Sequence, residues 1–189
     1  AFLPWHVLSI SGALLLSLTT SGLLTLFVPL DITTISALLP ISSAMALCGG
    51  AMFAARLFEE GTLPNLTRRL LTIAAVVMLV VALIYAAKPP WMRGFGIDIY
   101  YIGILQLIAL FILALFQALR RGSRVAIYQL VASIPIWVLV GVRIFTNLGA
   151  GDEPNDALVA SVAAQTFEIV VTSIAALVRF IALLRQERD

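Results

Sequence analysis

The stretch that decides the fold is residues 70–87, which read LLTIAAVVMLVVALIYAA and contain no charged side chain. These eighteen residues would extend about 27 Å as a helix, close to the ~30 Å hydrocarbon core of a bilayer. Lipid offers no hydrogen-bond partners, so the backbone polar groups of such a stretch must be satisfied within it. We therefore expect this stretch to cross a membrane as an α-helix.

Five further apolar runs repeat this pattern along the chain. Charged residues make up only 12% of the 189 residues and gather in short connectors, whereas 61% of the residues are hydrophobic. The five runs cover residues 5–28, 33–57, 99–118, 125–147 and 157–184. The sequence therefore predicts an all-α fold, a polytopic membrane bundle of six transmembrane helices that occupies residues 1–184.

Basic residues in the connectors predict the orientation of the bundle, because Lys and Arg in short loops favour the cytoplasmic side. One side holds nine arginines: Arg56, Arg68, Arg69, Arg120, Arg121, Arg124, Arg179, Arg185 and Arg188. The other side holds only Lys88, Arg93 and Arg143. We expect both ends of this chain to face the cytoplasm. An aromatic belt is expected near the outer boundary, formed by Tyr85, Trp91, Tyr100 and Tyr101.

The clearest charge at membrane depth is Glu168, about eleven residues into the last run. Intramembrane charges are costly and are functional candidates by default. Gln165 and Thr172 lie three residues before and four residues after it, so the three share one helix face. Two interpretations stay open: a polar switch whose protonation or partner changes with a signal, or a buried hydrogen bond that fixes the helix. Arg143 is the nearest candidate cation, although the helix rise separates the two residues by roughly 10 Å in depth.

Groups needed for catalysis or cofactor binding are scarce in this chain. One histidine, His6, and one cysteine, Cys48, provide neither a histidine-cluster metal site nor a disulfide. The only lysine, Lys88, lies in a connector, which excludes a buried Schiff base. No Gly-x-Ser-x-Gly elbow or phosphate-cradling loop occurs. We expect no catalytic residue, cofactor, metal or nucleic-acid partner in this segment, which leaves binding, transduction or transport across the lipid bilayer.

The last apolar run has no helix breaker at its cytoplasmic end. It carries apolar residues with heptad-like spacing, namely Val170, Ile174, Leu177, Ile181 and Leu184. Residues 185–189, RQERD, then continue as a polar stretch without Gly or Pro. This pattern predicts a homodimeric signalling helix, beginning at residues 185–189, that leads to a cytoplasmic output domain outside this chain.

Three stretches of the chain follow a family pattern. They comprise Phe53–Phe58 with Leu63-Pro64 and Arg68–Leu71, then Ala118–Ala126, then Gln165–Glu168 with Ser173–Ala175 and Arg179–Glu187. In these stretches the chain resembles the membrane domain of bacterial seven-transmembrane receptors with diverse intracellular signalling modules. The resemblance adds Ser173 and Arg179 to Glu168 as candidate transduction residues. Val178 departs from the pattern, in which an Asp before the arginine is more typical.

The resemblance implies that the six predicted helices match helices two to seven of the family. A first helix and a periplasmic sensor domain would then precede Ala1, and a diguanylate cyclase, histidine kinase or phosphatase module would follow. The implied function is a receptor in a bacterial inner membrane that couples a periplasmic or membrane stimulus to that module. Two alternatives stay open: a six-helix transport component like the substrate-binding subunit of a vitamin permease, and a structural module without a ligand. Few polar groups converge on one cavity, which disfavours transport.

Overall fold

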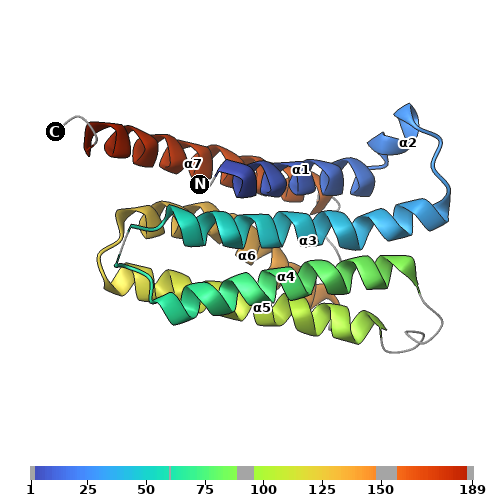
Figure 1. The fold of residues 1–189 in the computed structure, drawn as a ribbon. Helices are drawn as coiled ribbons and strands as arrows, with labels where there is room; N and C mark the ends of the chain where they lie inside the picture. Colours follow the sequence, from blue (N-terminus) through green and yellow to red (C-terminus); the bar gives the residue numbers. More distant parts are fainter. Residues whose placement is uncertain (1–2, 60, 89–95, 148–156, 187–189) are drawn as a thin grey trace. The chain divides into compact units, whose positions relative to one another are not determined.

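The computed structural model describes residues 3–59, 61–88, 96–147 and 157–186, and every regular element within them is an α-helix (Figure 1). The predicted all-α class is therefore confirmed for these residues. The chain divides into two compact units, Ala1–Gly122 and Ser123–Asp189. The helices of the first unit are α1 (Leu3–Thr20), α2 (Leu23–Phe27), α3 (Ile32–Leu57), α4 (Asn65–Ala87) and α5 (Gly96–Arg120). Those of the second are α6 (Arg124–Asn147) and α7 (Ala157–Gln186), which pack against each other.

The first predicted membrane run, residues 5–28, is not one helix. α1 ends at Thr20, and Gly22 takes a left-handed conformation with φ 73° before the short helix α2. The hydroxyls of Thr19 and Thr20 donate to carbonyl oxygens one turn earlier, at 2.6 and 2.8 Å. Such side-chain bonds compete with the helix ladder, and glycine adopts a positive φ without steric cost. The expectation of one span reaching residue 28 is wrong for this local reason.

α3 is the central helix of the first unit, with α1 on one side and α4 on the other (Figure 1). Two glycines let α1 and α3 approach until their backbones touch. A Cβ added at Gly12 would lie 2.4 Å from the Ala46 nitrogen, and one at Gly49 would lie 2.5 Å from the Ser9 nitrogen. The Ser9 hydroxyl donates to the Ala46 carbonyl at 3.1 Å across the same contact. Small residues at a helix contact are the usual basis of close packing in membranes.

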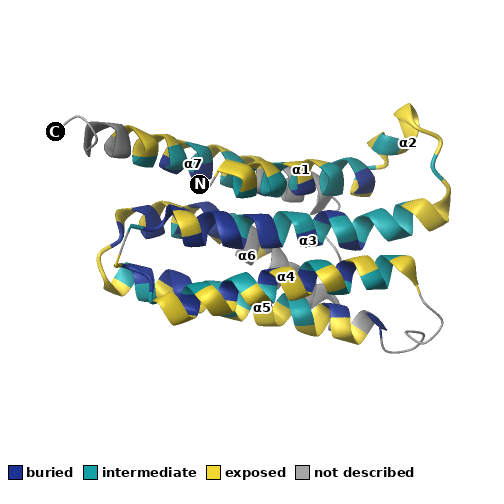
Figure 2. Ribbon diagram, in the orientation of Figure 1, coloured by how far each residue is buried: buried dark blue, intermediate teal, exposed yellow. Residues whose placement is uncertain are grey.

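The outer faces of α4 and α5 are apolar and exposed (Figure 2). On α4 the buried apolar side chains are Leu71, Ala75, Met78 and Ala82, whereas Val76, Val77, Val80 and Leu83 are between 49% and 56% exposed. A soluble protein rarely leaves so large a continuous apolar surface in water, whereas lipid covers it readily.

Four helices among the described residues are long and apolar enough to cross a membrane: α1, α3, α4 and α5. In α1, α3 and α4 the qualifying segment is the whole helix, and in α5 it is Asp98–Arg120. The chain is a membrane protein on these grounds. The predicted number of six spans remains a prediction.

Candidate functional site

The polar residues predicted as a candidate site all lie on one helix, α7. Gln165, Glu168, Thr172 and Arg179 follow one another at intervals of three, four and seven residues. Such intervals place them along one stripe of the helix, whereas Ser173 is rotated by about 100° from Thr172. The side chain of Gln165 lies outside the described part of the chain, as does that of Arg143 in α6. The predicted pairing of Arg143 with Glu168 therefore stays a prediction.

Thr172 and Glu168 lie on the more buried side of α7. Thr172 is 6% exposed, Ala164 and Ala175 are also buried, and Glu168 is partly buried. α6 is the helix against which α7 packs in this unit. Thr172 and Glu168 therefore lie on the side of α7 that is covered rather than on its most exposed face.

α6 also buries polar side chains. Gln129 and Ser133 are 4% and 3% exposed, and the Gln129 amide donates to the Ser133 hydroxyl at 3.4 Å. The Ser133 hydroxyl in turn donates to the Gln129 carbonyl at 2.9 Å. In a membrane bundle, polar residues collect away from lipid, where neighbouring helices can satisfy them. Both helices of the second unit thus carry polar groups on buried positions.

The hydrogen bonds that the Thr172 hydroxyl donates stay within α7. The Thr172 hydroxyl donates to the backbone carbonyls of Glu168 and Ile169, at 2.7 and 3.1 Å. Among the side chains that the structure describes, none donates to the Glu168 carboxylate. Thr172 is therefore beside Glu168 in the helix but bonds to its backbone rather than to its side chain.

The heptad-like residues of α7 lie on the opposite face from Thr172. Val170, Ile174, Leu177 and Ile181 are 51%, 51%, 58% and 42% exposed. The side chain of Leu184, the fifth residue of that pattern, is outside the described residues. α7 therefore carries Thr172 on a buried face and these four apolar residues on an exposed face.

Tyr100 makes contacts that the sequence did not predict: hydrogen bonds to α3 and a ring contact with α4. Tyr100 in α5 is 7% exposed, and its hydroxyl lies 2.5 Å from the Ser43 hydroxyl and 3.3 Å from the Pro40 carbonyl, both in α3. Its ring stacks on Tyr85 of α4 with 5.2 Å between centroids. The Tyr100 hydroxyl is thus satisfied inside the bundle, and the predicted aromatic belt stays a prediction. Tyr101 is 57% exposed, and Trp91 lies outside the described residues.

His6 and Cys48, the only residues of their types, take part in packing. The His6 ring stacks on Phe53 of α3, with 4.4 Å between centroids, and Cys48 is fully buried. Over the described residues no group of three or more His, Cys, Asp or Glu could hold a metal ion.

The chain matches a known protein family over most of its length. The family described as 7TM diverse intracellular signalling matches residues 1–179. No curated protein and no solved structure gave a significant match. The family match covers the whole first unit and most of the second, and it confirms the resemblance seen in the sequence. With its apolar helices and this match, the chain belongs to the seven-transmembrane family with diverse intracellular signalling, the membrane sensor domains of signalling receptors.

Proposed function

We propose that this domain couples a periplasmic or membrane stimulus to a cytoplasmic output module, a diguanylate cyclase or a histidine kinase, through α7. The supporting observation is the continuity of α7, which runs for 30 residues from Ala157 to Gln186. A helix of that length measures about 45 Å, whereas the hydrocarbon core is ~30 Å thick. About ten residues thus remain to carry a movement beyond the membrane as one rigid rod.

The bonding at buried polar positions suits a helix that moves against its neighbour. Thr172 donates to its own helix, and so does Ser133 of α6. A shift of α7 along α6 therefore breaks neither of these bonds. Displacements of about 1–2 Å are the usual scale of such helix shifts in receptors and allosteric proteins. Glu168 would bias such a shift through the environment that its carboxylate meets in each position.

We also infer that the receptor acts as a homodimer along the exposed apolar stripe of α7. That stripe has intervals of four, three and four residues, which match a coiled-coil seam, and its members are Val170, Ile174, Leu177 and Ile181. Single cysteines at these positions, in a full-length receptor whose Cys48 is replaced by alanine, should form disulfides between copies. Thr172→Cys, on the covered face, is the matched control. Cross-linking that is equal at Thr172 and at the stripe would contradict this seam.

Replacement of residues 185–189 tests the coupling in the full-length receptor. Five glycines should uncouple the output module, because glycine breaks the helix and adds backbone freedom. A replacement of equal length from Ala, Glu and Lys keeps the helix and serves as control. We expect the glycine variant to change output activity at least about fivefold, a typical allosteric coupling, whereas the helical control stays within about twofold. Equal activity of the two variants, or a full-length protein without an output module, contradicts the proposal.

Glu168→Gln separates a signalling role of this carboxylate from a structural one. The substitution keeps the side-chain shape and removes the charge. If the carboxylate biases α7, output activity changes while the thermal midpoint of the purified receptor stays close to that of the wild type. The structural interpretation predicts the reverse, a lower midpoint with unchanged output per folded receptor.

A further inference from the structure

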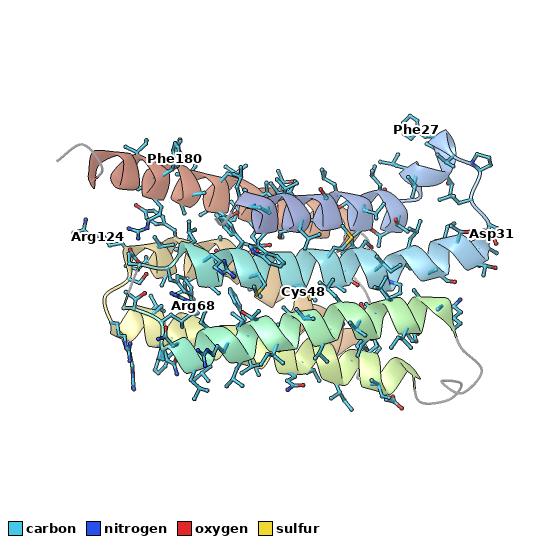
Figure 3. The ribbon with its side chains drawn as sticks, in the orientation of Figure 1. Phe27, Asp31, Cys48, Arg68, Arg124 and Phe180 are labelled. Carbon is cyan, nitrogen blue, oxygen red and sulfur yellow. The ribbon has the colours of Figure 1, made fainter. Side chains whose placement is uncertain are left out.

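A pocket of about 430 Å³ lies in the first unit, where the connector between α3 and α4 meets the end of α5. Its lining consists of Gly61, Leu63, Pro64, Asn65, Arg68 and Arg121. Leu63 is only 3% exposed, whereas Gly61, Asn65 and Arg121 are exposed, so the pocket has a buried wall and an open mouth. Figure 3 labels Arg68 in the first turns of α4. An arginine of α4 and one that directly follows α5 thus line one pocket.

Arg68 has a donor without an acceptor. Its Nε atom is buried and has no hydrogen-bond partner among the described residues. A buried polar group is nearly always hydrogen-bonded, and a charged one is costly to leave unsatisfied. The atom is closed off from solvent, so a change of the Arg68 side-chain conformation would be needed to bring it to an acceptor supplied from outside the chain.

Arg121 is held at the pocket by its contact with the connector. Its Nη1 donates to the Gly61 carbonyl at 2.9 Å. A guanidinium has five N–H donors in a planar fork, so this bond leaves others for a ligand. Two such forks that line one pocket match the oxygens of a phosphate, which arginine binds with paired hydrogen bonds.

The beginning of α4 adds a third source of attraction for an anion. Pro64 precedes the helix, and no side chain caps its first turn. The first helical bond that involves this residue runs from the Arg68 N–H to the Pro64 carbonyl at 3.0 Å, so earlier N–H groups lack helical acceptors. Together with the helix dipole, such N–H groups favour an anion, and phosphate is the anion most often found there.

Neighbouring side chains place the pocket at the edge of the lipid-facing surface. Leu66 and Leu70, on either side of Arg68 in the sequence, are 68% and 42% exposed. On α5, Phe116 is 50% exposed and the Arg120 guanidinium lies 4.4 Å from the centre of its ring. Exposed apolar residues next to arginines are typical of the boundary between acyl chains and headgroups.

The charge of this end of the bundle favours an anionic lipid. Around the pocket, residues 56–69 and 120–121 include five arginines, Arg56, Arg68, Arg69, Arg120 and Arg121, against two acidic residues, Glu59 and Glu60. The positive-inside rule predicts that this end is cytoplasmic, and basic pockets on that side bind the headgroups of anionic lipids. We propose that Arg68 and Arg121 bind the phosphate of an anionic phospholipid headgroup in this pocket. The proposal concerns lipid binding and does not depend on the output that the receptor controls.

Lipid binding to the purified full-length receptor tests the proposal, with phosphatidylglycerol and phosphatidylcholine as probes and native mass spectrometry as readout. Arg68→Gln and Arg121→Gln should each weaken phosphatidylglycerol binding about tenfold, the effect of losing one charge-assisted contact. Arg69→Gln and Arg120→Gln are the matched controls, since each removes the same charge one position away from the pocket. Their binding should stay within about twofold of the wild type. Arg68→Lys keeps the charge but loses the fork and should bind with intermediate strength.

Three outcomes would contradict the proposal, each for a different reason. Equal losses in the controls and in the pocket variants would mean that general surface charge attracts the lipid, and the pocket would have no special role. Equal binding of phosphatidylcholine would overturn the preference for an anionic headgroup. Displacement of the lipid by millimolar inorganic phosphate would identify a free phosphate as the occupant and overturn the lipid proposal. Thermal midpoints of all variants, measured in lipid-free detergent, show whether a loss comes from unfolding.

Discussion

At the scale of single residues, Gly49 sets the distance between α1 and α3. A Cβ added there would lie 2.5 Å from the Ser9 nitrogen, whereas one at Gly50 would meet only the Ser9 hydroxyl oxygen at 3.3 Å. Gly49→Ala must therefore push two backbones apart, and we expect it to lower the free energy of unfolding by about 2–3 kcal/mol. Gly50→Ala should be within about 1 kcal/mol of the wild type, because better helix propensity offsets a milder contact. Equal unfolding free energies for the two variants, measured by denaturant titration in micelles, would contradict this contact.

Asp31 is a second residue whose contribution, here to the stability of the first turn of α3, can be measured separately. Its carboxylate caps α3, accepts a hydrogen bond from the Thr34 N–H at 3.2 Å and also accepts from the Thr34 hydroxyl. The pKa of Asp31 is lowered, mainly by the Thr34 hydroxyl and then by that of Thr33. A lowered pKa means that the cap stabilises the folded state above the unfolded pKa of about 3.9 and is lost as the pH falls through the folded value.

Hydrogen exchange of the first turn of α3 checks the role of Asp31. Its protection, corrected for intrinsic exchange, should fall as the pH drops below about 4. Asp31→Asn keeps an acceptor for the cap but cannot titrate, so its protection should stay flat over the same range. Parallel profiles for the wild type and this variant would show that the carboxylate does not control the first turn.

At the scale of elements, Tyr100 connects α3, α4 and α5. Tyr100→Phe removes the hydroxyl that meets Ser43 and Pro40 while it keeps the ring that stacks on Tyr85. We expect a loss of about 1–2 kcal/mol in the free energy of unfolding, since the Ser43 hydroxyl loses its partner on another helix. Tyr101→Phe, at a position 57% exposed, should change it by less than about 0.5 kcal/mol. The prediction fails if both substitutions cost the same in thermal or denaturant unfolding.

Hydropathy predicted most helix positions, because each element must hide its backbone from lipid. The runs 33–57 and 125–147 each begin one residue after the helix that contains them, and α7 extends the run 157–184 by two residues. Hydropathy missed the end of α1, since the hydroxyls before Gly22 act locally and barely change the apolar character of the run. It also could not place Tyr100, whose burial depends on how α5 is rotated against α3.

The candidate site was predictable only in part, because the sequence pattern shows which residues share a helix face but not which helices meet there. Spacing along one helix shows that Glu168 and Thr172 share a face, and the structure buries Thr172 on that face. Contacts between helices depend on packing that no spacing encodes. The approach of Arg121 to Gly61, at 2.9 Å across 60 residues of chain, is one example. Small residues are so common in α1 and α3 that spacing alone does not single out Gly12 and Gly49 as the touching pair.

At the scale of the whole molecule, the proposed receptor joins its membrane bundle to an output module through one continuous helix. A rigid helix transmits rotation, and each added residue turns the downstream module by about 100°. Seven added residues complete nearly two turns and restore the facing direction to within about 20°. Coupling through α7 should therefore depend on the phase of an insertion rather than on its length.

The most direct test of this coupling is the output activity of full-length receptors with one to seven alanines inserted between Leu184 and Arg185. We expect large changes for one, two and five added residues and activity near that of the wild type for seven. Expression and membrane insertion, followed for every variant, serve as the control. Activity that stays flat across the series, or that declines steadily with length and shows no recovery at seven, would contradict the role of α7 as a rigid coupling helix.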